Sequence, residues 1–178
     1  MKQKSIKEKI FLLLQKLELH QRELERILKI NQTNIRRNLM NMEKENLFDK
    51  REVGKNKFYF VKDSFEAKIF FRIAENYKLI ELIKKPEMRK IVNEILKNKR
   101  IKLEILFESY TKNLVHKDSD IDIYLETNDL KLKKEVESIN SKISVKIGKF
   151  DERNLLIKEI VDNHVILKGV ERYAEIKF

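Results

Sequence analysis

Apolar residues recur at helical spacing in three stretches near the start of the chain. The first stretch follows Ser5, a suitable N-cap, and its apolar positions are Ile6, Ile10, Leu13, Leu14 and Leu17. The second runs from about His20 to Leu28, and we expect it to bury Leu24, Ile27 and Leu28. A third begins at Asn31 or Thr33 and reaches about Asn46, with an inward stripe of Ile35, Leu39 and Met42. Because only three residues join the second and third helices, the pair predicts a helix–turn–helix.

The residues that follow predict a β-hairpin. Phe48–Val53 and Lys57–Val61 have the composition of short strands, and Gly54-Lys55-Asn56 lies between them. Gly and Asn are favoured in tight hairpin turns because they adopt positive φ at little cost. The hairpin is basic around its tip, which holds Arg51, Lys55 and Lys57.

Two helices are predicted in the middle of the chain. Residues 64–85 carry an apolar stripe that we expect to lie in the core, made of Phe65, Ile69, Ile73, Tyr77, Ile80 and Ile83. Alternatively, this helix is a linker or a dimer contact. Pro86 ends this helix and suits the first turn of the next one. The second helix carries Met88, Ile91, Val92, Ile95 and Leu96.

The last third of the chain alternates between strands and helices. Strands are predicted at 102–107, 119–125, 143–150 and 165–167, and helices at about 131–140 and 155–163. The predicted fold class is therefore α+β, with three helices and a hairpin followed by a small mixed sheet covered by helices. We expect three segments: a helix–turn–helix domain at 1–63, a linker or dimerisation helix at 64–85, and an α/β domain at 86–178.

Charge separates the two halves of the chain. Residues 1–100 hold 26 Lys and Arg against 14 Asp and Glu, a net charge of +12, whereas residues 101–178 hold 14 against 15. This asymmetry indicates a nucleic-acid-binding N-terminal half, although a solvated lysine-rich surface would have the same composition. The chain has no cysteine, which excludes disulfides and thiolate chemistry. No apolar run reaches 18 residues, so we expect no membrane span and a cytoplasmic protein.

The third predicted helix has the side chains that a DNA-reading helix needs. Its outward positions are Gln32, Thr33, Asn34, Arg36, Arg37, Asn38 and Asn41. Asn and Gln bond adenine edges, Arg bonds guanine, and Thr contacts the thymine methyl group. The alternative is an ordinary solvated helix face. The crowding of amides and arginines in the first turns favours base contact, and the basic hairpin would add phosphate contacts through Arg51, Lys55 and Lys57.

Residues 5–62 together resemble the winged helix–turn–helix transcription factors of archaea and bacteria. The resemblance rests on the helix order, on residues 31–39, and on residues 47–53 followed by Gly54-Lys55-Asn56-Lys57. It implies a regulator that binds double-stranded DNA, and it implies a homodimer because paired reading helices match two half-sites. Some winged helices bind protein or RNA instead.

Two carboxylates stand two residues apart on a predicted strand. Asp120 and Asp122 should point to the same face, where their charges repel unless a cation lies between them. Mg²⁺ binds such a pair while keeping waters or substrate phosphates as its other ligands. Surface strands also carry such pairs by chance, so the pair is a candidate metal site with a chance pairing as the alternative.

The surroundings of this pair resemble the nucleotidyltransferase domain of the DNA polymerase beta superfamily, and most closely the minimal nucleotidyltransferases of archaea and bacteria. The motif is carried by Leu106-Phe107-Glu108-Ser109-Tyr110, a polar loop, and Ser119-Asp120-Ile121-Asp122-Ile123. The resemblance covers about residues 85–178. It implies that Asp120 and Asp122 bind Mg²⁺, that Ser109 contacts the phosphates of a nucleoside triphosphate, and that the source is archaeal.

The chain departs from that family at two positions. Glu108 stands where the family has a glycine that lets the backbone approach phosphate. Lys146 stands about where a third carboxylate is usual, and a lysine there could neutralise the aspartates without a metal. Two functions therefore stay open. One is a DNA-binding regulator with a degenerate nucleotidyltransferase domain. The other is an active Mg²⁺-dependent enzyme that transfers a nucleoside monophosphate to a protein or nucleic acid, and here the resemblance also admits a helical toxin-type partner.

Overall fold

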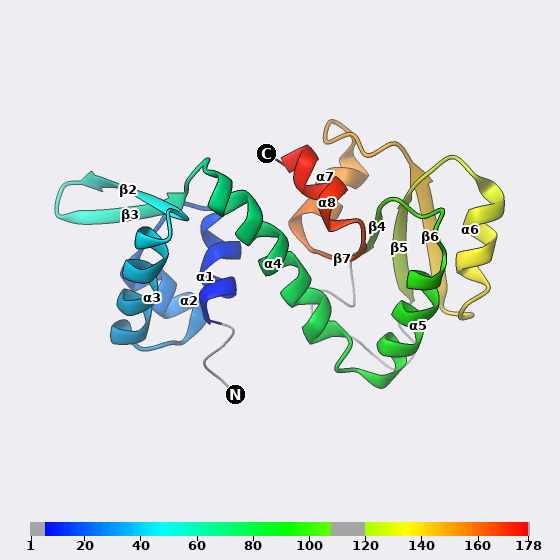
Figure 1. Cartoon of the computed structure of the whole chain (residues 1–178), viewed down its shortest axis with the longest axis horizontal. Coiled ribbons are helices and arrows are strands. Elements are labelled where there is room, and N and C mark those ends of the chain that lie inside the picture. Colours follow the sequence, from blue (N-terminus) through cyan, green and yellow to red (C-terminus); the bar gives the residue numbers. More distant parts are fainter. Residues whose placement is uncertain (1–5, 108–119, 178) are drawn as a thin grey trace. The chain divides into compact units, whose positions relative to one another are not determined.

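The computed structural model describes residues 6–107 and 120–177, and it confirms the α+β class (Figure 1). The chain forms two compact units, Met1–Tyr77 and Lys78–Lys177. The boundary falls inside one helix, α4, which spans Phe65–Leu82. None of the helices in the described ranges is long and apolar enough to cross a membrane.

The first unit contains three helices and a small antiparallel sheet before it enters α4. The sheet has the order β1-β3-β2, and β2 pairs with β3 from Phe48↔Val61 to Val53↔Asn56. Only Gly54 and Lys55 connect these strands, and Gly54 has a φ of 61° that an L-residue adopts at a cost. The elements are α1 Ile6–Leu14, β1 Leu19–His20, α2 Gln21–Leu28, α3 Gln32–Lys44, β2 Phe48–Val53 and β3 Asn56–Val61.

The core of this unit confirms most of the predicted inward positions. Ile10, Leu24, Ile35, Leu39 and Met42 are all buried. Aromatic side chains extend the core: the Phe11 ring lies 5.8 Å from the ring of Phe48 and 5.0 Å from that of Phe70. Two predicted inward positions are wrong, since Leu17 and Ile27 are exposed.

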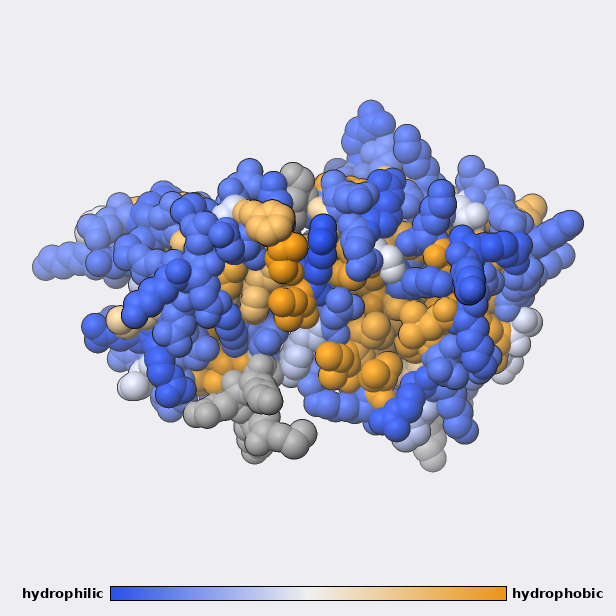
Figure 2. Space-filling model, viewed as in Figure 1, coloured by the Kyte–Doolittle hydropathy of each residue, from blue (hydrophilic) through white to orange (hydrophobic). Residues whose placement is uncertain are grey.

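The prediction that the stripe along residues 64–85 lies in the core is wrong for four of its six positions, whereas Ile83 packs against the core of the second unit. Phe65, Ile69, Ile73 and Ile80 are exposed, and Phe65 keeps 76% of its surface accessible. Figure 2 shows hydrophobic residues gathered along this helix. In the first unit α4 instead buries its opposite side, which carries Ala67, Phe70, Phe71 and Ala74. Both sides of the helix are apolar, so spacing alone did not identify the buried one.

The second unit has a four-stranded mixed sheet of order β6-β5-β4-β7. The pair β5–β6 is parallel, whereas β4 runs antiparallel to both β5 and β7. One face of the sheet packs against α5, α6 and the last turn of α4 through Ile91, Ile95, Leu132 and Val136. The elements are α5 Pro86–Lys97, β4 Glu104–Phe107, β5 Ile121–Glu126, α6 Leu130–Glu137, β6 Ile143–Gly148, α7 Leu155–Asp162, β7 His164–Lys168 and α8 Val170–Lys177.

The other face of the sheet carries an aromatic cluster beside its polar residues. The Phe150 ring lies 5.9 Å from the Tyr124 ring and 5.7 Å from the Tyr173 ring, and Tyr173 belongs to α8. The Tyr124 hydroxyl donates a hydrogen bond of 2.8 Å to the Gly148 carbonyl. This cluster fixes β5 and β6 to each other on the face that also carries Asp122.

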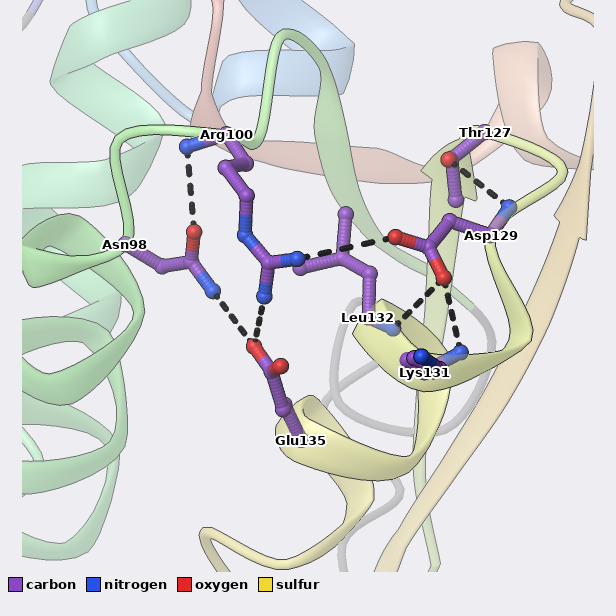
Figure 3. Close-up of polar contacts among 7 residues, drawn as sticks. All are labelled: Asn98, Arg100, Thr127, Asp129, Lys131, Leu132 and Glu135. Carbon is purple, nitrogen blue, oxygen red and sulfur yellow. Dashed lines mark hydrogen bonds and ion pairs between the residues drawn. The ribbon is translucent and has the colours of Figure 1, made fainter.

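A network of exposed polar contacts holds the start of α6 (Figure 3). Asp129 caps the helix by accepting hydrogen bonds from the backbone N–H groups of Lys131 and Leu132, at 2.8 and 3.2 Å. Arg100 forms ion pairs with both Asp129 and Glu135. Ion pairs this exposed contribute little stability each, so the backbone cap by Asp129 is the contact that matters most for the start of α6.

One carboxyl group is buried in the second unit. Glu104 on β4 has no exposed surface, and neither of its carboxylate oxygens has a hydrogen-bond partner within the described ranges. Burial raises the pKa of Glu104 to about 8, while the charge of Lys168 acts in the opposite direction. Glu104 is therefore predominantly protonated at neutral pH.

Candidate nucleic-acid interface and candidate carboxylate site

Local capping fixes the helix–turn–helix. His20 begins α2 with a capping box: its Nδ1 accepts from the Glu23 backbone N–H at 3.2 Å, and Glu23 accepts from the His20 N–H at 3.0 Å. Lys29 ends the helix in the left-handed region with a φ of 54°. Asn31 then caps α3 by accepting from the Asn34 N–H at 2.9 Å. The three-residue turn is thus defined by side chains within the motif.

The seven predicted reading residues of α3 divide into two groups. Gln32, Thr33, Arg36 and Asn41 are exposed, and their side chains make no hydrogen bond or ion pair with the rest of the described chain. Three others form a local network. Arg37 Nη2 donates to Asn34 Oδ1 at 3.2 Å, and Asn38 Nδ2 donates to the Asn34 carbonyl at 2.8 Å. The first group is free to meet a ligand without breaking a contact.

The hairpin presents its three predicted basic residues on an exposed arm. Arg51 Nε donates to Glu18 Oε2 at 2.6 Å, and its guanidinium lies 5.9 Å from the centroid of the Phe58 ring. Lys57 pairs with Glu52 at 3.3 Å. Lys55 stands in the turn and has no such partner among the described residues. Arg51 is therefore anchored to the domain, whereas Lys55 is the cation most available to a phosphate.

The acidic residues near the C-terminal end of α3 are already neutralised. Glu43 accepts an ion pair from Lys50, and Glu45 accepts one from Lys7. The exposed side of α3 between Gln32 and Asn41 contains no acid at all. The remaining local charge is that of Arg36 and Arg37, which favours a polyanion.

Sequence reasoning passed over one exposed residue on this helix. Met40 has 49% of its surface accessible, whereas Leu39 and Met42 on the same helix are buried. A helical projection of residues 32–44 would have found it, because Met40 follows Arg36 by four residues.

The carboxylate pair lies at the start of β5. Asp120 directly precedes the strand and is exposed, and Asp122 is half-buried within it. Asp122 is paired in register with Phe107 on β4 and with Ser144 on β6. Residues of matching register share a face, so Ser144 belongs to the candidate site. The predicted phosphate contact Ser109 and the neighbouring Glu108 lie outside the described residues.

The charges of Asp120 and Lys146 act on the Asp122 carboxyl in opposite directions. Burial raises the pKa of Asp122, the charge of Asp120 raises it further, and the charge of Lys146 lowers it. Lys146 is exposed and pairs in register with Tyr124, two pairs further along the sheet than Asp122 and on the same face. Among the described residues no ion pair within 4.0 Å joins Lys146 to either aspartate. The charge of Lys146 thus acts on Asp122 without forming an ion pair with it.

The described residues hold no group of three or more His, Cys, Asp or Glu side chains arranged to bind a metal. Asp120 just before β5 and Asp122 within it supply two carboxylates, which suits Mg²⁺ because this ion keeps several waters or substrate oxygens as ligands. The chemistry of the donor set therefore fits a divalent cation whose remaining ligands come from elsewhere.

Comparison with known proteins gives only partial structural likenesses. No family model and no curated protein matches the chain. A crystal structure of a toxin–antitoxin with AMP-PNP is similar over 48% of this chain and 79% of its own, at 23% identity and a TM-score of 0.37. The zinc-dependent MarR family transcriptional regulator AdcR in its Zn(II)-bound state is similar over 53% of this chain and 70% of its own, at 19% identity and a TM-score of 0.30. At these TM-scores neither likeness carries an argument about function.

Proposed function

We propose that this protein is a transcriptional regulator that binds double-stranded DNA through its first unit. The observation that carries the proposal is the acid-free, exposed side of α3 next to an exposed basic hairpin. In this arrangement α3 enters the major groove, where Gln32, Arg36 and Asn41 bond base edges. The hairpin follows the backbone and places Lys55 against a phosphate.

Salt-dependent binding to duplex DNA tests this proposal. Fluorescence anisotropy with a pool of random 30-base-pair duplexes should give binding at 50 mM salt that weakens steeply by 200 mM. Lys55→Ala should lower the slope of log affinity against log salt by about one, on every duplex alike. Arg36→Ala should instead cost about 1–3 kcal/mol on a selected duplex and less on the random pool.

The matched control is Lys158→Ala, which removes one exposed lysine from α7 in the other unit. It should leave both the affinity and the salt slope unchanged. Absence of binding at 50 mM salt would overturn the proposal, and so would equal slopes for Lys55→Ala and Lys158→Ala.

The regulator is proposed to act as a homodimer that uses α4. Phe65, Ile69 and Ile73 form an exposed apolar stripe along three successive turns of this helix. Burying such a stripe against a second copy would remove it from water. Sedimentation of wild type and of the Ile69→Ser, Ile73→Ser double variant tests this, because the variant should be monomeric at concentrations where the wild type is dimeric. The homodimer proposal is contradicted if the wild type is monomeric at a protein concentration 100-fold above its Kd for DNA.

A second candidate is Mg²⁺-dependent nucleotidyl transfer, favoured by the Asp120–Asp122 pair. Asp120 and Asp122 would hold Mg²⁺, which would neutralise the phosphates of a nucleoside triphosphate. An acceptor oxygen on a protein or nucleic acid would bond to the α-phosphorus as pyrophosphate leaves. A helical toxin-type protein is the partner proposed for this second candidate. In the first candidate the same domain is degenerate, because Lys146 already acts on the pair.

Metal binding and transfer are measured separately to decide between the candidates. Mn²⁺ titration followed by electron paramagnetic resonance reports a cation site, and Asp120→Asn should weaken it at least tenfold. Incubation with labelled nucleoside triphosphates and Mg²⁺ should label an acceptor in wild type alone. The enzyme proposal fails if wild type and Asp120→Asn behave alike in both assays, whereas the DNA-binding proposal does not depend on either.

A further inference from the structure

Met40 stands in the middle of the side of α3 that is proposed to face DNA. Arg36 precedes it by one turn and Lys44 follows it by one turn, so the three lie in one row along the helix. The buried residues Ile35, Leu39 and Met42 lie on the other side. Met40 exposes 49% of its surface to solvent, so it contributes little to the core.

The surface around Met40 indicates what it can contact. Its neighbours on the row are cationic, and the acids Glu43 and Glu45 are paired with lysines. A polyanion that also carries an apolar group could pair with the cationic side chains of Arg36 and Lys44 and contact the Met40 thioether. An apolar protein groove would instead remove water from the arginine and the lysine without giving them a partner. Among base edges in the major groove, only thymine offers an apolar group, its C5-methyl.

We propose that Met40 is a specificity-determining residue that packs on the C5-methyl group of a thymine in the major groove. This inference rests on the proposed DNA binding and adds a base preference to it. A methionine side chain is unbranched and adapts to an irregular surface, so a contact of this kind needs no rigid pocket. Its sequence neighbour Asn41 is exposed and suits the adenine of an adjacent pair, so the two residues together favour A·T pairs.

Helix geometry sets the expected position of this thymine. Four residues along an α-helix rise about 6 Å, and base pairs are spaced about 3.4 Å apart. The thymine that meets Met40 should therefore lie about two base pairs from the pair that meets Arg36, on a helix that lies along the groove. A thymine contacted by Met40 should lie to one side of the Arg36 base pair, and a thymine contacted by Thr33 to the other side, because Thr33 precedes Arg36 along α3 and Met40 follows it.

Replacing thymine by uracil removes only the methyl group and tests the contact directly. A preferred duplex is selected from a random pool with the full-length protein, and each thymine in turn is replaced by uracil. Wild type should lose about fourfold in affinity at one position, the value of one buried methyl group. Met40→Ala and Met40→Gln should bind the thymine and uracil duplexes equally while keeping the wild-type salt slope.

The matched control is Leu130→Ala, which truncates an exposed apolar residue of the second unit and should keep the wild-type preference for thymine. Wild-type binding that is equal for thymine and uracil at every position would overturn the role of Met40 and leave DNA binding standing. A preference for thymine that survives in both Met40 variants would also overturn it. Absence of any binding at 50 mM salt would remove the proposed function together with this inference.

Discussion

Glu104 should make the stability of the second unit fall as the pH rises. Its carboxyl group is fully buried, without a hydrogen-bond partner among the described residues, and its pKa rises from an ordinary 4.5 to about 8. Between these two values the folded chain keeps a proton that the unfolded chain has released. The stabilisation is therefore complete below pH 4.5, declines from there, and has been lost once the pH passes 8.

The size of the effect follows from the same two values. A difference of one bound proton changes the free energy of unfolding by about 1.4 kcal/mol per pH unit. Between pH 4.5 and about 8 the total is about 5 kcal/mol, an upper figure because water entry and side-chain relaxation reduce the cost of burying the charge. Glu104→Gln keeps the shape and removes the ionisation, so its stability should not decline in this way.

Urea unfolding followed by circular dichroism at pH 5 and pH 8 measures the difference. At pH 5 wild type and Glu104→Gln should agree within about 1 kcal/mol, since both then carry a neutral group at this position. At pH 8 the variant should be more stable by about 2 kcal/mol or more. Glu171→Gln, on an exposed residue of α8, is the control and should follow the wild type. A wild-type to Glu104→Gln difference that is the same at both pH values would refute the assignment of a buried neutral carboxyl.

Three further predictions concern backbone and charge. Asn31→Ala removes the cap of α3 and should lower stability by about 1 kcal/mol in urea unfolding, with no change in the second unit. Gly169→Ala should destabilise by about 3 kcal/mol, because φ is 86° and the new Cβ would lie 2.0 Å from a backbone carbonyl oxygen. Gly54→Ala, at a φ of 61° with open space around it, should cost only about 1 kcal/mol, and equal losses for the two variants would contradict the steric argument. Lys146→Met should raise the pKa of Asp122 in a carbon-13 titration, and an unchanged pKa would show that the lysine does not act on the aspartates.

The first unit was predicted well because its signals are local. The α2–α3 turn, the buried stripe of α3 and the hairpin each depend on residues a few positions apart. Two elements escaped: β1 has only two residues, and α8 follows β7 after the single residue Gly169. β1 is too short to leave a periodic pattern, whereas α8 is as long as the predicted helices α6 and α7 and was not recognised as a helix.

In the candidate sites, too, the features that depend on nearby residues were predictable and those that depend on distant residues were not. The spacing of Asp120 and Asp122 predicted a shared side of one strand. In the structure Asp120 precedes β5, Asp122 lies within it, and the charge of Asp120 raises the pKa of Asp122. The position of Lys146 relative to them depended on the parallel register of β5 and β6, which the sequence does not fix. The engagement of Asn38 with the Asn34 carbonyl required side-chain positions.

The sequence by itself determined the order of the elements other than β1 and α8, the charge difference between the halves, and the residues presented by α3, because periodicity, capping and turn chemistry act over a few residues. Only the tertiary structure decided which side of α4 is buried and that Glu104 lies in the core without a hydrogen-bond partner among the described residues. It also decided that the charge of Lys146 acts on Asp122 without an ion pair. These outcomes depend on the neighbours that packing brings from distant parts of the chain, and burial or an electric field at a residue is a property of those neighbours.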